Sequence, residues 1–247
     1  MQAGPQGPQT TATRLRAESC RALDEAVTRA GEVAPRQLIE AGLLTGSPAL
    51  AVTQGGSGAL MLVVGARGRG GFAVLLLGSV SRYAAMHADC PVVVVREETS
   101  AVHREVVVGV RDPRDADATL GYAFDEAARR GATLVTVHSW NWPHSALSGH
   151  PGGDAAGPSA GAEDAAEVGR RLAEVLAAWR DKYPEVPVWQ DVVHDHPAHV
   201  LATYSARADL VVIGRHDETP ARRVVAGIQH AVMNHARGPV AIVPGAG

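Results

Sequence analysis

Residues 62–81 read Leu-Val-Val-Gly-Ala-Arg-Gly-Arg-Gly-Gly-Phe-Ala-Val-Leu-Leu-Leu-Gly-Ser-Val-Ser. The opening apolar run predicts a buried strand, and the glycines after it let backbone N–H groups approach an anion without interference from side chains. A helix that begins at Ser79 would direct its free N–H groups and the positive end of its dipole towards the same anion. The stretch therefore predicts an α/β fold with a phosphate site at the carboxyl end of a parallel strand.

The chain contains an internal repeat. The run Leu62–Gly65 matches Val211–Gly214, 149 residues later, and after one deletion residues 91–95 match 239–243. A single register kept over this distance indicates a duplication. The expected organisation is a first domain at residues 1–98, a linker at 99–104 and a second domain at 105–247.

The second copy is predicted to be complete. Its strands and helices alternate, which is typical of βαβ units in a parallel sheet. Its predicted strands are 105–110, 132–138, 186–193, 208–213 and 239–243, and its predicted helices are 116–130, 162–182, 197–207 and 222–236.

The first copy starts later in the pattern. Its predicted elements are a helix at 12–31, a strand at 36–44, a helix at 48–54, a strand at 59–64, a helix at 79–88 and a strand at 91–95. By comparison with the second copy, roughly 47 residues of strand–helix–strand have no counterpart. The strand at 36–44 thus has no neighbour, and unpaired strand edges are costly. We hypothesise that the reading frame begins further upstream or that the gene is decaying.

The glycine pattern resembles that of a known family. Gly65-x2-Gly68-x9-Gly78-Ser79 resembles the ATP-binding signature of the universal stress protein family, and the resemblance covers about residues 13–244 in two copies. It implies two tandem Rossmann-like domains of the adenine-nucleotide α-hydrolase type. Each would be a parallel five-stranded sheet of order 3-2-1-4-5, the first lacking strands 1 and 2 and helix 1. It also implies pairing of the domains through their last strands, an edge that a homodimer could use instead.

The resemblance implies that the first copy binds ATP, with Arg67 and Arg69 able to add positive charge. A solvated turn or an RNA contact is the alternative interpretation of residues 67–71. The expected site residues are Gly65, Arg67, Gly68, Arg69, Gly70, Gly78, Ser79, Val80 and Ser81.

The second copy departs from the signature. Asp217 replaces a glycine, Pro220 removes an N–H donor, and Ile228 replaces the hydroxyl residue. In its first strand, Arg111 stands at the acidic position of the family. A carboxylate beside phosphates costs several kcal/mol, so we expect this copy to bind ATP weakly or not at all. The remnants of this degenerate site are Asp112, Gly214, Asp217 and Gly227.

Composition excludes several classes of protein. The net charge of −3 argues against a general nucleic-acid or membrane-surface binder, and the apolar runs are too short to span a bilayer. Cys20 and Cys90 form no framework, as expected in the cytoplasm, and residues 1–9 do not read as a signal peptide.

No catalytic group or metal site is predicted. His194-Asp195-His196 with His199 resembles a metal cluster, but a solvated turn is the favoured interpretation. Slow ATP hydrolysis lacks a placed general base. The sequence favours an ATP-binding stress-response regulator, and the alternative is a scaffold or dimerisation module that has lost its ligand.

Overall fold

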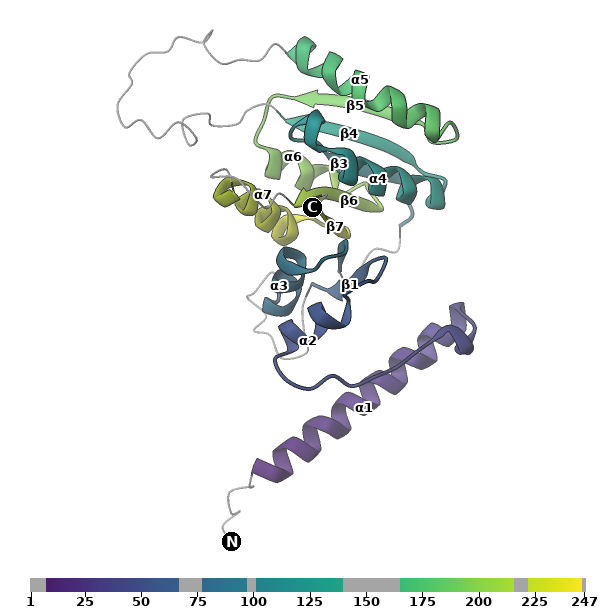
Figure 1. Ribbon diagram of the computed structural model, residues 1–247, viewed down its shortest axis with the longest axis vertical. Coiled ribbons are helices and arrows are strands. Elements are labelled where there is room, and N and C mark those ends of the chain that lie inside the picture. The colour runs from purple at the N-terminus through teal and green to yellow at the C-terminus, as the bar shows by residue number, and fades with distance from the viewer. Residues whose placement is uncertain (1–7, 67–76, 97–100, 140–164, 216–221, 246–247) are drawn as a thin grey trace, which may run out of the picture. The chain divides into compact units, whose positions relative to one another are not determined.

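The computed structural model describes residues 8–66, 77–96, 101–139, 165–215 and 222–245 (Figure 1). The chain forms two compact units, Met1–Ala51 and Val52–Gly247.

The first unit holds a long helix, α1 (Pro8–Val33), and a short 3₁₀ turn, η1 (Arg36–Leu38). The strand predicted at 36–44 is wrong, because residues 36–38 form this turn and no strand follows up to residue 44. In the second copy the corresponding strand, β5 (Val188–Val193), pairs with β4 (Thr133–Ser139). The described part of the first unit offers no such neighbour, and an extended segment without one leaves its N–H and C=O groups to water.

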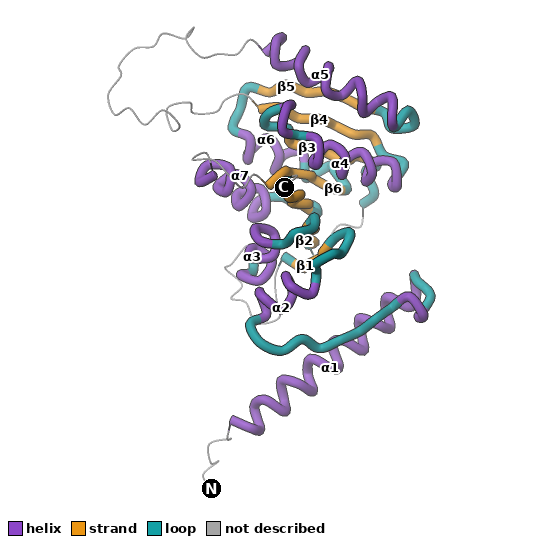
Figure 2. The backbone as a smooth tube through the Cα atoms, viewed as in Figure 1, coloured by secondary structure: helices purple, strands orange, loops and turns teal. Residues whose placement is uncertain are grey.

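The second unit is built on one seven-stranded sheet of order β1-β2-β7-β6-β3-β4-β5 (Figure 2). Besides β4 and β5, its strands are β1 (Leu62–Gly65), β2 (Val92–Val95), β3 (Glu105–Gly109), β6 (Leu210–Arg215) and β7 (Val240–Pro244). Its helices are α3 (Ser79–His87), α4 (Asp117–Arg130), α5 (Ala165–Lys182), α6 (Pro197–Tyr204) and α7 (Arg222–His235), with a 3₁₀ turn η2 (Pro113–Asp115). The helix α2 (Pro48–Gly55) precedes β1.

The second copy confirms the strand order expected from the sequence. Its strands run β5-β4-β3-β6-β7, which is 3-2-1-4-5 in order of appearance, and all four pairings are parallel. Helix α4 ends as its sequence predicts, because Gly131 adopts the left-handed conformation (φ 55°) and its N–H bonds the carbonyls of Ala127 and Ala128. The first copy contributes β1 and β2, which pair in parallel.

The sheet is continuous between the copies because β2 and β7, the last strand of each, lie antiparallel with Val93 opposite Ala241. Two arginines cross this junction. The Arg215 guanidinium donates to the carbonyl of Ala88 at 2.6 Å, just after α3, and Arg96 donates to the carbonyl of Met233 in α7.

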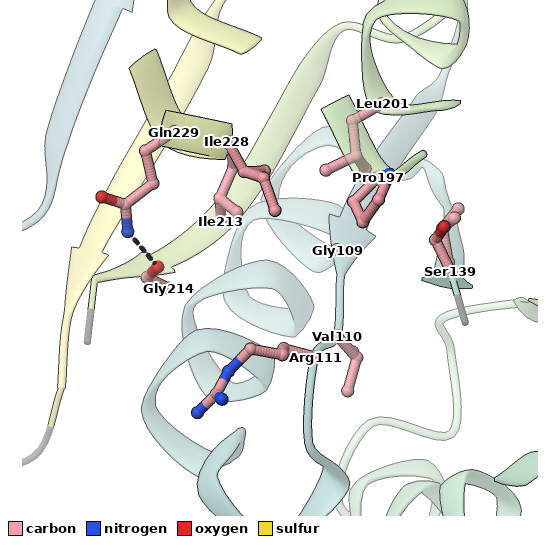
Figure 3. Close-up of a pocket in the computed structure, with 11 residues that line it drawn as sticks. Gly109, Val110, Arg111, Ser139, Pro197, Leu201, Ile213, Gly214, Ile228 and Gln229 are labelled. Atoms are coloured by element: carbon pink, nitrogen blue, oxygen red, sulfur yellow. Dashed lines mark hydrogen bonds between the residues drawn. The ribbon is translucent and has the colours of Figure 1, made fainter. Parts of the chain in front are cut away.

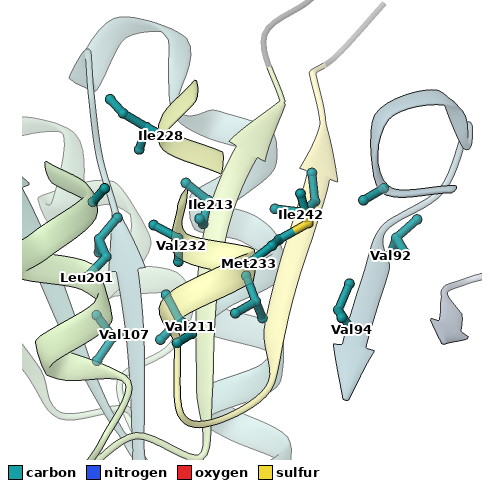
Figure 4. Close-up of a cluster of buried hydrophobic side chains, with 14 of the residues drawn as sticks. Val92, Val94, Val107, Leu201, Val211, Ile213, Ile228, Val232, Met233 and Ile242 are labelled. Atoms are coloured by element: carbon teal, nitrogen blue, oxygen red, sulfur yellow. The ribbon is translucent and has the colours of Figure 1, made fainter. Parts of the chain in front are cut away.

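Helices cover both faces of the sheet. Helices α3, α6 and α7 pack on one face in a core that includes Val92, Val94, Met233 and Ile242 (Figure 4). Helices α4 and α5 pack on the other face. The carboxyl ends of β3 and β6, where the strand order reverses, therefore form the crevice at which open α/β sheets bind ligands.

Candidate functional site

The first-copy site lies where β1 leads to α3. The N–H of Gly78 donates to the carbonyl of Ala66 at 2.7 Å, and the Ser81 hydroxyl donates to the carbonyl of Gly65 at 2.6 Å. These two bonds bring the end of β1 and the start of α3 together, and with them five of the predicted site residues: Gly65, Gly78, Ser79, Val80 and Ser81. The other four, Arg67, Gly68, Arg69 and Gly70, lie outside the described residues.

The start of α3 is suited to an anion. Gly78 is the N-cap with φ −70° and ψ 150°, and it has no side chain to satisfy the first N–H groups of the helix. The first helical bond runs from Arg82 N–H to the Gly78 carbonyl, so the N–H groups of residues 79–81 precede the regular ladder. Ser79 is exposed and the first turn contains no carboxylate. The positive end of the helix dipole therefore meets no carboxylate within the first turn of α3 itself.

The second copy uses the same anchoring contact with a different side chain. The Gln229 amide donates to the carbonyl of Gly214 at 2.7 Å, as Ser81 does to Gly65 (Figure 3). Gln229 is 1% exposed, so this contact is sealed from water. It joins β6 to α7 but adds no group that could meet a phosphate.

Helix α7 begins earlier than its first-copy counterpart. It starts at Arg222, whereas Ile228 is the residue that matches Ser79. Gly227 and Ile228 therefore lie inside the helix, about 9 Å beyond its start at 1.5 Å per residue. N–H groups at such positions bond the preceding turn. The second copy thus lacks an open helix start at the place where the first copy has one.

A small cavity occupies the crevice of the second copy. It measures about 60 Å³. Its walls come from β3, β4, β6, α6 and α7, and Figure 3 shows Ile213, Ile228, Leu201 and Pro197 bordering it. Gly109 lets the Leu201 side chain approach β3 closely, since a Cβ at position 109 would lie 2.9 Å from Leu201 Cδ1. The lining of the cavity is mainly apolar, with Arg111, Ser139 and Gln229 as its polar side chains.

Among the described remnants of the degenerate site, Gly214 alone borders the cavity. Gly227 is exposed within α7, and Asp217 lies outside the described residues. Asp112 does not border the cavity; it caps η2 and accepts hydrogen bonds from the backbone and guanidinium of Arg114. The bonds from Arg114 lower the pKa of the Asp112 carboxyl. The guanidinium of Arg111 points away from Pro197 and Leu201 in Figure 3.

Two further motifs have local structural roles. His196 caps α6 by accepting from the N–H of Ala198 at 3.3 Å, and Asp195 accepts from the N–H of His196. The described residues contain no group of three or more His, Cys, Asp or Glu arranged to hold a metal. Cys90 is buried and donates to the carbonyl of Gly56 at 3.4 Å, and burial raises the pKa of its thiol.

Sequence reasoning missed the apolar lining of the second crevice. It expected weak or no ATP binding from the charge of Asp217, the missing donor at Pro220 and the missing hydroxyl at Ile228. The described residues add an apolar lining of the crevice and an earlier helix start. The predicted helix 222–236 already held the signal, because it places Gly227 and Ile228 within a helix. The filling by Leu201 and Ile228 depends on packing between distant segments, which spacing alone does not reveal.

Comparison with known proteins identifies relatives of both copies. The model of the universal stress protein family matches residues 2–96 and again 103–244. Universal stress protein Rv2005c of Mycobacterium tuberculosis is 35% identical over 209 residues, which are 83% of this chain and 68% of the relative. Universal stress protein Rv2623 of the same species is 36% identical over 189 residues, which are 74% of this chain and 61% of the relative.

A solved structure shares the fold. The crystal structure of a universal stress protein from Archaeoglobus fulgidus superposes with a TM-score of 0.67 at 16% identity, over 99% of this chain and 82% of that one. Within the described residues, no helix combines the length and the apolar character needed to cross a membrane.

Proposed function

Because the chain belongs to the universal stress protein family, we propose that it is a regulatory protein of the stress response that binds ATP where β1 meets α3. The proposal rests on one observation above all. The glycine N-cap at residue 78 leaves the start of α3 open, and Ser81 ties that start to the end of β1. The glycine-rich stretch 67–71 joins these two points in the sequence.

In this proposal the N–H groups of Ser79 and Val80 and the Ser79 hydroxyl bind phosphate oxygens. Arg67 and Arg69 add positive charge from the connecting stretch. Occupancy would stabilise the junction between residues 65 and 81 and so change the surface that a partner meets. The protein would act in the cytoplasm. It would bind ATP without catalysis, because the sequence supplies no general base near residues 67–71.

Isothermal titration of the full chain with ATP tests the proposal. We expect saturable binding, weaker binding of AMP, and no measurable release of phosphate over the time of the titration. A folded chain, verified by circular dichroism, that gives no heat with ATP would refute ligand binding. Steady phosphate release would refute the non-catalytic part alone.

A second candidate function is a scaffold that pairs domains without a ligand. Two observations favour it: the crevice of the second copy is small and apolar, and β2 and β7 join the copies edge to edge. In this reading the last strands serve as the functional junction, within one chain or between two. Loss of ATP binding together with retained assembly, measured by analytical ultracentrifugation, would favour the scaffold.

A further inference from the structure

A larger cavity lies at the opposite ends of the second copy's strands from the crevice. It measures about 440 Å³ and is lined where β3, β4 and β5 begin and where α6 ends. Val135 in its lining belongs to the core that α6 covers, so the cavity opens on that face of the sheet. All of its lining residues belong to the second unit.

One wall of this cavity holds a guanidinium. Arg207, just after α6, places its guanidinium carbon 4.5 Å from the centre of the Tyr204 ring, and its Nε lies 3.4 Å from Oε1 of Glu105. That oxygen is buried and accepts no hydrogen bond within the described residues. An aromatic face beside a carboxylate suits a guanidinium, because its planar cation stacks on the ring and pairs with the acid.

A second pair of the same kind lines the cavity. Trp189 and Asp191 lie two apart on β5, opposite Val135 and Val137 of β4, so both side chains leave the sheet on the α6 face. Trp189 is 70% exposed. Across the part of the chain that the structure describes, no cation lies over the Trp189 ring and none forms an ion pair with Asp191.

Tyr204 links the two aromatic–carboxylate pairs. Its ring carries Arg207, and its hydroxyl donates to the carboxylate of Asp191. Burial and this hydrogen bond raise the pKa of Tyr204 to about 12, so the hydroxyl keeps its proton at neutral pH. A neutral donor therefore positions the Asp191 carboxylate without cancelling its charge.

The other cations of the lining lie at the far end of the cavity. Arg104 precedes β3, and its carbonyl accepts from the N–H of Thr133, at the start of β4. Asp191 lies opposite Val137, four residues further along β4, which is roughly 13 Å at 3.3 Å per residue. The charge of Arg207 is offset by Glu105. The negative charge beside Trp189 is thus left for a ligand.

We propose that this cavity binds the guanidinium group of a ligand, which stacks on Trp189 and pairs with Asp191. Arg207 on Tyr204 and Glu105 is the arrangement that the ligand repeats. The guanidinium belongs either to an arginine of a peptide or to a free guanidino compound, since both offer the same group. The cavity and the junction of β1 with α3 share no residue, so this proposal and ATP binding stand or fall separately.

An NMR titration of the ¹⁵N-labelled full chain with the peptide acetyl-Gly-Arg-Gly-amide tests the proposal. The readout is the indole N–H signal of Trp189, one of 4 tryptophans, assigned by its loss in Trp189→Phe. We expect a saturable shift with a dissociation constant in the millimolar range, weakened severalfold as salt rises. An unchanged Trp189 signal, or equal shifts of every indole, would overturn the proposal.

Matched probes separate charge from shape and one source from the other. The peptide with citrulline in place of arginine keeps the shape without the charge and should bind at least about tenfold more weakly. Equal binding of the two peptides would contradict the proposal. Agmatine, a free guanidino compound, identifies the source: binding as tight as the peptide's supports a free ligand, and weaker binding supports an arginine of a polypeptide.

A matched pair of variants locates the contact. Asp191→Asn removes the charge but keeps an acceptor for the Tyr204 hydroxyl, and should weaken binding of the arginine peptide about fivefold. Asp181→Asn, at an exposed position in α5, is the control and should bind as the unsubstituted chain does. Equal affinities of the two variants would contradict the assignment. Both variants should bind ATP as the unsubstituted chain does, which keeps this test distinct from that of the nucleotide site.

Discussion

The junctions β1–α3 and β6–α7 descend from one sequence pattern and now differ in their anchoring side chain and in where the helix begins. The first copy keeps a serine contact, an open helix start and a short α3 (Ser79–His87). The second copy has a glutamine contact, a helix that begins at Arg222 and an apolar filling of the crevice. The contact between strand and helix is thus retained where the anion-binding geometry is not. Packing needs the junction whether or not a ligand uses it.

The junctions are also linked through Arg215. This residue ends β6, is 8% exposed, and bonds the carbonyl that follows α3. A cation at the carboxyl end of α3 is favoured by the helix dipole. The second copy therefore stabilises the helix whose opposite end is the proposed nucleotide site.

The largest expected effect is that of Arg215→Ala. It leaves the Ala88 carbonyl without its charged donor and removes a buried side chain, so the free energy of unfolding should fall by about 3 kcal/mol in urea titrations. Arg82→Ala, at an exposed position on α3, is the control and should change it by less than about 0.5 kcal/mol. Equal effects of the two substitutions would show that the cross-copy bond has no special role.

Ser79→Asp separates ligand binding from stability. A carboxylate at the helix start would repel phosphates and lower the ATP affinity by about 2 kcal/mol, roughly thirtyfold, in calorimetry. The same charge interacts favourably with the helix dipole, so the melting temperature should hold or rise. Unchanged ATP affinity would place any nucleotide site elsewhere.

Ser81→Ala and Gln229→Ala compare the two anchoring contacts. Loss of the Ser81 hydroxyl leaves the Gly65 carbonyl without this donor, at a cost of about 1 kcal/mol in the free energy of unfolding. It should also weaken ATP binding, because one of the two bonds that hold the end of β1 to the start of α3 is lost. Gln229→Ala should destabilise the chain but leave the ATP affinity unchanged. A loss of affinity with Gln229→Ala would mean that the second copy takes part in binding.

The smallest expected effect concerns Asp112. The hydrogen bond from Arg114 lowers the pKa of the Asp112 carboxyl in the folded chain. The ionised carboxylate therefore stabilises the fold at pH values above the pKa that Asp112 has in the unfolded chain. This stabilisation is lost as the pH falls through the lower pKa of the folded chain. The Arg114 side chain is largely exposed and water screens the pair, so Asp112→Asn should cost only about 0.5 kcal/mol at neutral pH. The difference between the two proteins should vanish in acid, as urea titrations at several pH values would detect. A difference that persists in acid would mean that the ion pair is not its source.

Local patterns predicted most of this fold. The repeat, the alternation of strands and helices, and stop signals such as Gly131 placed nearly every element within a few residues. The segment 36–44 failed because its apolar character suits a strand, yet strand formation depends on a partner that local sequence does not contain. The same limit applies to the crevice of the second copy, where Leu201 and Ile228 meet only after the chain has folded.

The candidate site was predicted in part. Gly78 and Ser81 lie where the spacing predicted, at the meeting of strand and helix. The contact from Ser81 to Gly65, and its replacement by Gln229, could not be read from spacing because a side chain's partner depends on the angle at which a helix meets its strand.

Hydrogen exchange of the full chain with and without ATP tests the central claim most directly. The account predicts slower exchange of the N–H groups of residues 79–81 when ATP is present, and no change at residues 227–230. Protection at 227–230, or at neither place while ATP binds, would contradict it.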